Sequence, residues 1–475
     1  MFEKQNVLFI ITDQQQKQTL DADSICMTPN IENLKKDSIN FDKAYTCNAI
    51  CSPSRASLMT GLLPHNHGMV DCTHNVPEYR ANFCENSDML SRKLKRNGYR
   101  LGYYGKWHIE RSNQLENFGF DDYETEVHLP SFSRTMIESY QVEHHGYNDR
   151  ILSGVCKERI DETEEYYIFS KGIEFIQNQV DNNPNQPWSL FLSTYAPHDP
   201  YIVPEELYEM YDIENINLPD NFEDDLKDKP SIYKRLQTLW KDLELDDYRK
   251  VIACYYAYCT LVDTQLKRVI DILKQTGQYD NTLIVYLSDH GDMMGAHGLF
   301  CKGVTPFEEV YNIPLIIKWP NSNLRGYNCS TYVSMHDIAP TILDMLGYDS
   351  LENTDGESIV PYINGLKKDN DKVAYAEFHG QRMFYTQRII WKNNFKYIFN
   401  GFDYDEFYDL NNDPFELNNV INEVGYQIKV EELAREMWEV VKRSGDFNLL
   451  DTDYYMFRFA PIGPEAKLRE SLYNK

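Results

Sequence analysis

The chain has 475 residues, a formal net charge of −27 and 42% hydrophobic residues, with aromatic side chains at 13% of the whole. This composition is that of a folded globular protein, and the length suits one large domain plus a smaller one. The acidity argues against nucleic acid as a partner, because phosphate binding needs a basic face. An acidic protein that binds an anion must gather Lys, Arg, a metal ion or helix N-termini around one pocket.

The first residues predict neither an export signal nor a membrane anchor. The apolar run from Val7 to Ile11 ends just before Asp13, too soon for the apolar core of a signal peptide or for a bilayer span. Ten cysteines without a C-x-x-C pair are typical of reduced thiols rather than of a disulfide framework. We therefore expect a cytoplasmic protein that does not contact a membrane.

Short apolar runs alternate with helical patterns along most of the chain. Continuous apolar runs predict strands buried on both faces, at 7–11, 101–104, 189–192, 283–287 and 315–317. Apolar residues at helical spacings predict helices at 90–97, 167–180 and 248–276. The alternation predicts an α/β domain over residues 1–365, with a central sheet flanked by helices on both sides.

The pattern changes after the polar segment 365–371, which we interpret as a linker. Residues 384–390 and 395–399 are typical of antiparallel strands joined through 391–394, and residues 430–444 of a helix. They predict a smaller α+β domain at residues 372–475.

Polar residues follow four of the predicted strands, where ligands of open α/β sheets bind. They are Asp13 and Gln14, Lys106 and His108, His198, and Asp289 and His290. Two pairs of oxygen and nitrogen ligands, Asp13 with Gln14 and Asp289 with His290, favour one divalent cation over the alternative that each Asp caps a helix. Ligand chemistry alone leaves Ca²⁺, Mg²⁺, Mn²⁺ and Zn²⁺ open.

Two lysines and two histidines carry weaker signals. Lys106 and His108 are two residues apart, so their side chains share one face if the strand continues through them. Each alone could equally be a snorkelling lysine or a hydrogen-bonded histidine, His198 could cap a loop, and Lys302 could be a solvated charge.

The segment from Cys47 to Gly61 places a cysteine at the predicted start of a helix. Pro53 suits the first turn and Gly61 the C-terminal cap. Cys51 then lies where the helix dipole and free N–H groups favour an anion, with Arg55 one turn later. From the residues alone, Cys51 is either a nucleophilic thiolate of low pKa or a buried structural cysteine.

The run Cys51-Ser52-Pro53-Ser54-Arg55, followed by Thr60-Gly61, resembles the C-x-P-x-R…T-G signature of type I sulfatases in the alkaline-phosphatase superfamily. The likeness extends to the polar residues after the strands, to Lys302-Gly303 and to Tyr408-Asp409-Leu410, whereas Leu62 departs from the basic residue that the family often has there. It implies an alkaline-phosphatase-like α/β domain with a smaller C-terminal domain. It also implies a maturation enzyme that oxidises Cys51 to formylglycine.

The resemblance further implies a role for each residue. Asp13, Gln14, Asp289 and His290 would hold a cation, most often Ca²⁺, together with the modified Cys51. Arg55, Lys106 and Lys302 would surround the sulfate, His198 would protonate the leaving oxygen, and His108 would take the proton of the second hydroxyl. The Asp-Gln/Asp-His set resembles a branch with choline sulfatases, some carbohydrate sulfatases and phosphonate monoester hydrolases, where Mn²⁺ also occurs.

The alcohol half of the small anionic sulfate ester is less determined. A sulfated carbohydrate is our first expectation, because Asn75, Arg382 and the segments 134–145, 199–201 and 379–381 bring groups that can bind hydroxyls or a carboxylate. Choline sulfate comes second, since a Tyr-rich pocket can hold a quaternary ammonium. The rivals are a phosphonate monoester or phosphodiester hydrolase and an inactive binding protein with unmodified Cys51. A homo-oligomer stays open, and His65, His67 and His297 are expected to support the structure rather than bind the metal.

Overall fold

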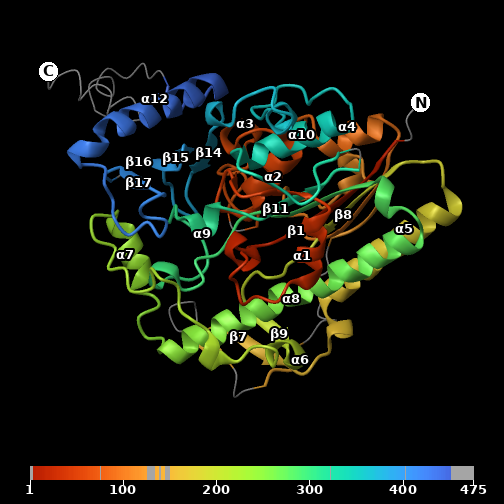
Figure 1. Cartoon of the computed structure of the whole chain (residues 1–475), viewed down its shortest axis with the longest axis horizontal. Helices are drawn as coiled ribbons and strands as arrows, with labels where there is room; N and C mark the ends of the chain where they lie inside the picture. The colour runs from red at the N-terminus through yellow and green to blue at the C-terminus, as the bar shows by residue number, and fades with distance from the viewer. Residues whose placement is uncertain are drawn as a thin grey trace.

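A central mixed sheet organises the computed structural model, which describes residues 4–74, 76–125, 134–137, 141–144, 150–320, 322–401 and 403–450 (Figure 1). The strand order is β12-β2-β11-β10-β1-β8-β4-β5. The bounds are β1 Asn6–Thr12, β2 Ile39–Phe41, β4 Arg100–Gly105, β5 Asp122–Glu124, β8 Trp188–Ser193, β10 Thr282–Ser288, β11 Leu315–Lys318 and β12 Tyr327–Cys329. All five strands predicted for this domain lie in the sheet, and β1 is parallel to both β10 and β8.

Helices cover both faces of the sheet, because successive side chains of a strand point to opposite faces. Leu8 and Ile10 of β1 belong to the core that contains α1 (Pro29–Lys36), α5 (Glu164–Asn182) and α8 (Leu245–Gln275). Val7 and Phe9 belong to the core that contains α2 (Cys51–Thr60), α4 (Leu90–Arg96) and α10 (Ile338–Met345). The predicted helices at 90–97, 167–180 and 248–276 correspond to α4, α5 and α8.

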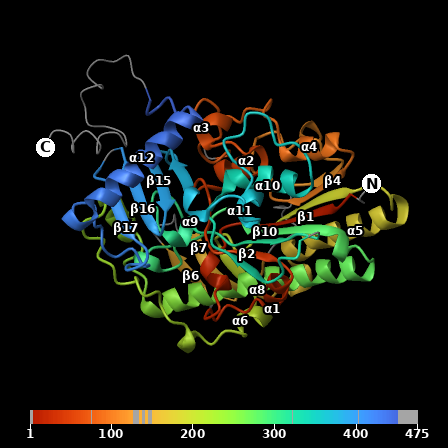
Figure 2. The ribbon, with the colours of Figure 1, turned by 45° about the horizontal axis from the view of Figure 1, so that its top comes forward.

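A second, antiparallel sheet follows, with strands β14 (Ala374–Phe378), β15 (Gln387–Lys392), β16 (Phe395–Asn400) and β17 (Glu406–Asp409). Helix α12 (Gln427–Ser444) packs on β15 and β16, at one side of the molecule in Figures 1 and 2. The first strand of the predicted pair begins at Gln387 rather than at residue 384. Residues 379–385 instead form a tight loop, in which Gly380 has a φ of 102° and Tyr385 N–H donates to the carbonyl of His379.

Shorter strands and α-helices connect these elements in the described residues. They are β3 Ala44–Tyr45, β6 Val142–His144, β7 Arg150–Cys156, β9 Tyr201–Pro204, β13 Val333–Ser334, α3 Pro64–His67, α6 Glu205–Tyr208, α7 Ser231–Gln237, α9 Glu308–Tyr311 and α11 Val360–Ile363. Among the helices of the described residues, none combines the length and the apolarity needed to cross a bilayer.

Candidate active site

The carboxyl ends of β4, β8, β1 and β10 meet at one edge of the sheet. Thr12 of β1 lies opposite Ser288 of β10, and Ser193 of β8 lies opposite both Ile11 and Gly105. This register brings the polar residues that follow these four strands to one place. Helix α2 starts there too, with Cys51 as its first residue.

Four buried side chains form a candidate metal site at this edge. One ligand atom each of Asp13, Cys51, Asp289 and His290 lies within 4.8 Å of the others. Sγ of Cys51 is 3.2 Å from Nε2 of His290 and 3.6 Å from Oδ1 of Asp13. Nδ1 of His290 donates to the carbonyl of Gly291 at 2.9 Å, which leaves the lone pair on Nε2 for a ligand role. Two carboxylates and one imidazole nitrogen therefore fit a divalent cation.

Gln14 lies beside this group in a left-handed backbone conformation, with a φ of 71°. Its backbone N–H donates to Oδ1 of Asp289 at 3.1 Å, and its side-chain oxygen accepts a hydrogen bond from Lys302. Its Nε2 donates to the buried carboxylate of Asp292, which also accepts from the Tyr201 hydroxyl at 2.6 Å. Asp292 and Tyr201 thus orient the Gln14 amide.

The Arg55 guanidinium crosslinks the carboxylates of Asp13 and Asp289. Its Nε donates to Oδ2 of Asp289 at 2.8 Å and its Nη2 to Oδ2 of Asp13 at 3.0 Å. Its Nη1 donates to the Lys106 carbonyl and to the Ser193 hydroxyl. Burial alone would lower the pKa of Arg55, but Asp289 and Asp13 raise it above its ordinary value. All three guanidinium nitrogens make hydrogen bonds within the protein, so Arg55 positions the two carboxylates. The role at the sulfate that the resemblance implies for Arg55 stays a prediction.

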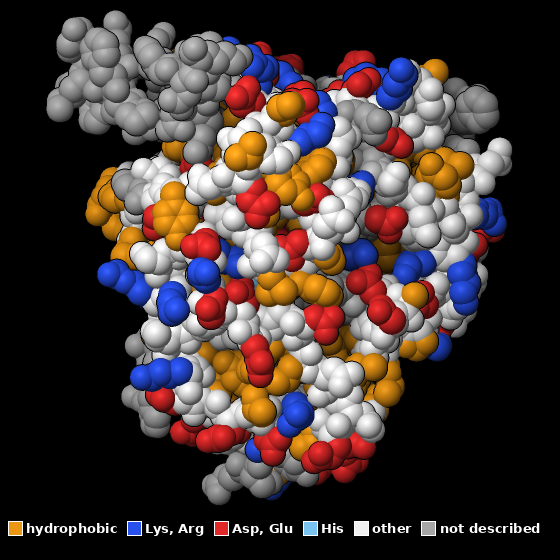
Figure 3. All heavy atoms as spheres, turned by 60° about the vertical axis from the view of Figure 1, so that its left-hand side comes forward, with side chains coloured by type: hydrophobic (Ala, Val, Ile, Leu, Met, Phe, Trp, Pro, Cys, Tyr) orange, Lys and Arg blue, Asp and Glu red, His pale blue; other side chains and the backbone are white. Residues whose placement is uncertain are grey.

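Lysine side chains concentrate positive charge around Cys51. Nζ of Lys106 lies 2.5 Å from Oδ2 of Asp13 and 3.6 Å from Sγ of Cys51. Burial raises the pKa of the Cys51 thiol, but Lys106, Lys302 and His290 outweigh this effect and hold the pKa well below its usual range. The face in Figure 3 shows acidic side chains scattered among basic and apolar ones. The net charge of −27 thus coexists with lysine side chains gathered beside Cys51.

Lys302 and His198 form a hydrogen-bonded pair over the site. Nδ1 of His198 donates to the backbone carbonyl of Asp199 at 2.6 Å. Its Nε2 therefore accepts from Nζ of Lys302, at 2.7 Å. The pair can pass a proton to a group bound in front of it.

The strand does not continue through Lys106 and His108, so their side chains do not share a strand face. Strand β4 ends at Gly105, which has a φ of 97° and whose absent Cβ would lie 2.0 Å from the Ser193 carbonyl oxygen. The chain turns at this glycine, and His108 takes a φ of 57°. The turn brings Nζ of Lys106 to Asp13, whereas Nε2 of His108 lies 2.7 Å from Nδ1 of His74. His108 still lies near Cys51, because both residues line the same cleft.

A cleft of about 1780 Å³ opens in front of Cys51. Of the predicted residues, it is lined by Lys106, His108, His198, Lys302 and Arg382, together with Arg134, Asp199, Pro200 and Gln381. Tyr201 is buried beneath Gln14 instead. Asn75 lies outside the described residues, and so does part of the segment 134–145.

Three histidines with expected supporting roles bond elsewhere. Nε2 of His67 lies 2.9 Å from the Ser57 hydroxyl, Nδ1 of His65 lies 2.9 Å from the Glu377 carboxylate, and Nδ1 of His297 lies 2.6 Å from the Asp224 carboxylate. Sequence reasoning left Asp292, Cys72 and His74 without a role. Asp292 stands in the same run as Asp289 and His290, which is a usable signal, whereas nothing in the sequence marks Cys72 or His74.

Comparison with known proteins identifies the family. The family model described as Sulfatase matches residues 5–348. The chain belongs to the sulfatase family. This sulfatase is a sulfuric ester hydrolase, and the family generally uses a metal ion and formylglycine. A second model, described as N-sulphoglucosamine sulphohydrolase, C-terminal, matches residues 295–443.

Relatives of this sulfatase cover nearly its full length. The uncharacterized sulfatase YidJ of Escherichia coli is 30% identical over 89% of this chain and 84% of its own length. The choline-sulfatase of Rhizobium meliloti is 28% identical over 88% and 82%. The N-acetylglucosamine-6-O-sulfatase of Bacteroides thetaiotaomicron is 27% identical over 95% and 89%.

Solved structures match the alkaline-phosphatase-like fold that the resemblance implied. A phosphonate monoester hydrolase of Agrobacterium radiobacter has a TM-score of 0.76 at 24% identity, covering 93% of this chain and 96% of its own. A protein in complex with its substrate D-glucosamine-2-N,6-O-disulfate has a TM-score of 0.74 at 22% identity, covering 94% and 99%. At these identities, the likeness shows the fold.

Proposed function

We propose that this sulfatase acts through formylglycine formed at Cys51, with one divalent cation, Ca²⁺ as first choice, held by Asp13, Gln14, Asp289 and His290. The observation that carries the proposal is the position of Cys51. Its Sγ lies at the start of α2, within 3.6 Å of Asp13, His290 and Lys106. A nucleophile at this position lies next to both the cation site and the lysine ammonium groups. Mn²⁺ and Mg²⁺ are the alternative cations.

In the proposed mechanism, the formylglycine, the cation and the side chains of the protein each have a separate role. The hydrated aldehyde supplies an attacking hydroxyl and a second hydroxyl that allows sulfate to leave, which neither Ser nor Cys offers. The cation supplies Lewis-acid polarisation of the reacting oxygens. Lys106 and Lys302 stabilise the charge on the sulfate. Lys302 passes a proton to Nε2 of His198, which then protonates the leaving oxygen, and His108 takes the proton of the second hydroxyl.

A sulfated carbohydrate is the proposed substrate class. The cleft of about 1780 Å³ exceeds the volume of a site for a small metabolite and has room for more than one sugar ring. Its rim carries hydroxyl- and carboxylate-binding groups such as Arg111, Asn113, Gln381 and Arg382. The likeness to an N-acetylglucosamine-6-O-sulfatase supports the same class.

Choline sulfate is the second candidate, favoured by a different feature of the cleft. Trp107, Tyr195 and Tyr258 line it together with the carboxylate of Glu164, a combination that can bind a quaternary ammonium. The likeness to a choline-sulfatase supports this class. Phosphonate monoesters are the third candidate, on the fold shared with phosphonate monoester hydrolases.

The test of this proposal combines mass and activity. After co-expression with a formylglycine-generating enzyme, the proposed partner in maturation, the tryptic peptide ending at Arg55 should carry an aldehyde in place of the thiol. Sulfate release should be highest from a panel of sulfated mono- and disaccharides, lower from choline sulfate and lower still from an aryl phosphonate. Cys51→Ala should release none. An unmodified peptide in an active enzyme, or equal activity of Cys51→Ala, would refute the proposal.

A further inference from the structure

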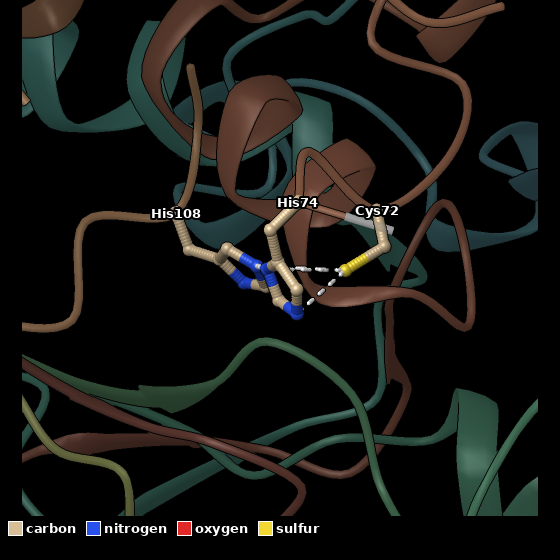
Figure 4. Close-up of side chains that lie close together, drawn as sticks. All are labelled: Cys72, His74 and His108. Atoms are coloured by element: carbon tan, nitrogen blue, oxygen red, sulfur yellow. Dashed lines mark hydrogen bonds between the residues drawn. The ribbon is translucent and has the colours of Figure 1, made fainter. Parts of the chain in front are cut away.

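A second cluster of metal-binding side chains lies beside the candidate active site. Sγ of Cys72 lies 3.5 Å from Nε2 of His108 and 3.8 Å from Nδ1 of His74. These two nitrogens are 2.7 Å apart. Figure 4 shows the two rings stacked, with 4.6 Å between their centroids, and the thiol beside them. None of the three belongs to the group around Asp13 and Asp289.

The geometry is close to that of a tetrahedral zinc site. With ordinary Zn–N and Zn–S bonds, two nitrogen ligands lie about 3.4 Å apart, and sulfur lies about 3.6 Å from nitrogen. The two sulfur–nitrogen distances of 3.5 and 3.8 Å already match. The nitrogen–nitrogen distance must open by about 0.7 Å, which a small rotation of the half-exposed His74 ring can supply. One thiolate and two imidazoles are soft and borderline ligands, which favour Zn²⁺ or Cu⁺ over Ca²⁺.

Hydrogen bonds hold the two loops of this cluster in place. The N–H of Thr73 donates to the hydroxyl of Ser52 in α2 at 3.1 Å. The buried carboxylate of Asp71 accepts from the Cys72 and Arg382 backbone N–H groups. Arg111, three residues after His108, donates to the carbonyls of Val76 and Ala81. The ligand atoms are therefore close together before any ion binds, which lowers the cost of binding.

We propose that Cys72, His74 and His108 form a second metal site, which takes Zn²⁺ or Cu⁺ and thereby inhibits the enzyme. The cleft in front of the three residues leaves a fourth coordination position to water or substrate. The site itself stands on geometry alone, while the inhibitory effect rests on the role proposed for His108.

The proposed inhibition depends on the two ring nitrogens of His108, which have different roles. Nε2 of His108 faces His74 and Cys72, while Nδ1 is buried without a hydrogen-bond partner among the described residues. If Nε2–H donates to His74, Nδ1 is free to accept a proton. A metal ion on Nε2 moves the ring proton to Nδ1, so the neutral imidazole can no longer accept one there. Sulfate release then stops even though the first metal site is intact.

Binding is measured with Co²⁺ as a spectroscopic probe on the Ca²⁺-saturated Cys51→Ala protein, in which the other reactive thiol is removed. We expect one equivalent of Co²⁺ to bind with a thiolate-to-cobalt charge-transfer band that Zn²⁺ displaces. Cys72→Ser should abolish the band. His74→Gln should weaken binding by about tenfold or more, since loss of a ligand costs at least as much as loss of a ligand's hydrogen-bond partner. Cys84→Ser, at an exposed cysteine, is the matched control and should keep the band.

Inhibition is measured on the matured enzyme, each variant relative to its own zinc-free rate. Zn²⁺ should inhibit reversibly, a chelator selective for zinc over calcium should restore the rate, and His74→Gln should need about tenfold more Zn²⁺ for the same inhibition. A charge-transfer band that survives in Cys72→Ser, or no band in a Cys51→Ala protein that is folded and binds Ca²⁺, would overturn the site. Zinc inhibition equally strong in His74→Gln would overturn the inhibitory role. An enzyme without sulfatase activity would refute the proposed function but not the cobalt result.

Discussion

Nε2 of His290 lies 3.2 Å from Sγ of Cys51, while Nδ1 of the same ring donates to the Gly291 carbonyl. The backbone hydrogen bond fixes the tautomer and the ring orientation, so an imidazole nitrogen and not an oxygen faces the Cys51 side chain.

This relationship predicts the metal preference of the site. His290→Asn replaces the imidazole by an oxygen ligand, so the affinity for Mn²⁺ should fall relative to that for Ca²⁺, by roughly tenfold or about 1.4 kcal/mol. Calorimetric titration of the metal-free protein with each ion checks the ratio. An unchanged ratio would mean that His290 is not a ligand.

We expect replacement of Asp292 to change the metal affinity, although its carboxylate does not belong to the metal-binding group. It orients the Gln14 amide through Nε2, so Asp292→Asn should weaken Ca²⁺ binding by about 10- to 100-fold. Asp246→Asn, at an exposed carboxylate, serves as the control. Equal Ca²⁺ affinities of the two variants in the same titration would remove the supporting role of Asp292.

We expect replacement of Arg55 to lower the stability of the protein as well as its activity. Arg55→Ala removes the guanidinium from the buried carboxylates of Asp13 and Asp289, and only Asp13 keeps a lysine partner, so unfolding should become easier by about 3–5 kcal/mol in the metal-free protein. Because a divalent cation would neutralise the same carboxylates, added Ca²⁺ should recover part of this loss. Thermal unfolding with and without Ca²⁺ measures both effects, and the exposed Arg443→Ala should change stability by no more than about 0.5 kcal/mol. Stability equal to that of Arg443→Ala would contradict the crosslinking role.

We expect replacement of Lys106 to lower the rate of sulfate release. Lys106→Gln removes the ammonium group 3.6 Å from Cys51 Sγ, and kcat for sulfate release should drop about 10²- to 10³-fold. Mass spectrometry of the Cys51 peptide is needed beside the rate, because a failure of maturation would imitate the loss. Lys241→Gln, on the exposed surface, should keep the wild-type kcat. A rise in KM with an unchanged kcat would assign Lys106 to ground-state binding.

The His65–Glu377 pair should make the stability of the fold depend on pH. Burial lowers the pKa of His65, but the Glu377 carboxylate at 2.9 Å raises it from 6.5 to about 9. Because the folded pKa is the higher one, the protonated pair stabilises the fold fully below pH 6.5, and this contribution is lost as the pH rises through about 9. The loss amounts to about 3 kcal/mol. The thermal midpoint should fall over this range in the wild type and less steeply in His65→Gln, and parallel slopes would contradict the assignment.

The strands of the central sheet could be predicted because β1, β4, β8 and β10 are buried on both faces, so their sequences are continuous apolar runs. The strand at 384–390 was placed too early because nothing in a run of aromatic residues reveals the loop that Gly380 starts. The polar residues after the strands were found because parallel strands end at one edge.

By itself, the sequence identified Cys51 as the candidate nucleophile, the helix that begins with it and the residues that gather around it, because these depend on local patterns and on the family signature. Only the tertiary structure decided that Arg55 faces Asp13 and Asp289, that Asp292 orients Gln14, and that Cys72 and His74 meet His108. Each of these contacts joins distant parts of the chain. They depend on the register of neighbouring strands and on the turn at Gly105, neither of which a local pattern encodes.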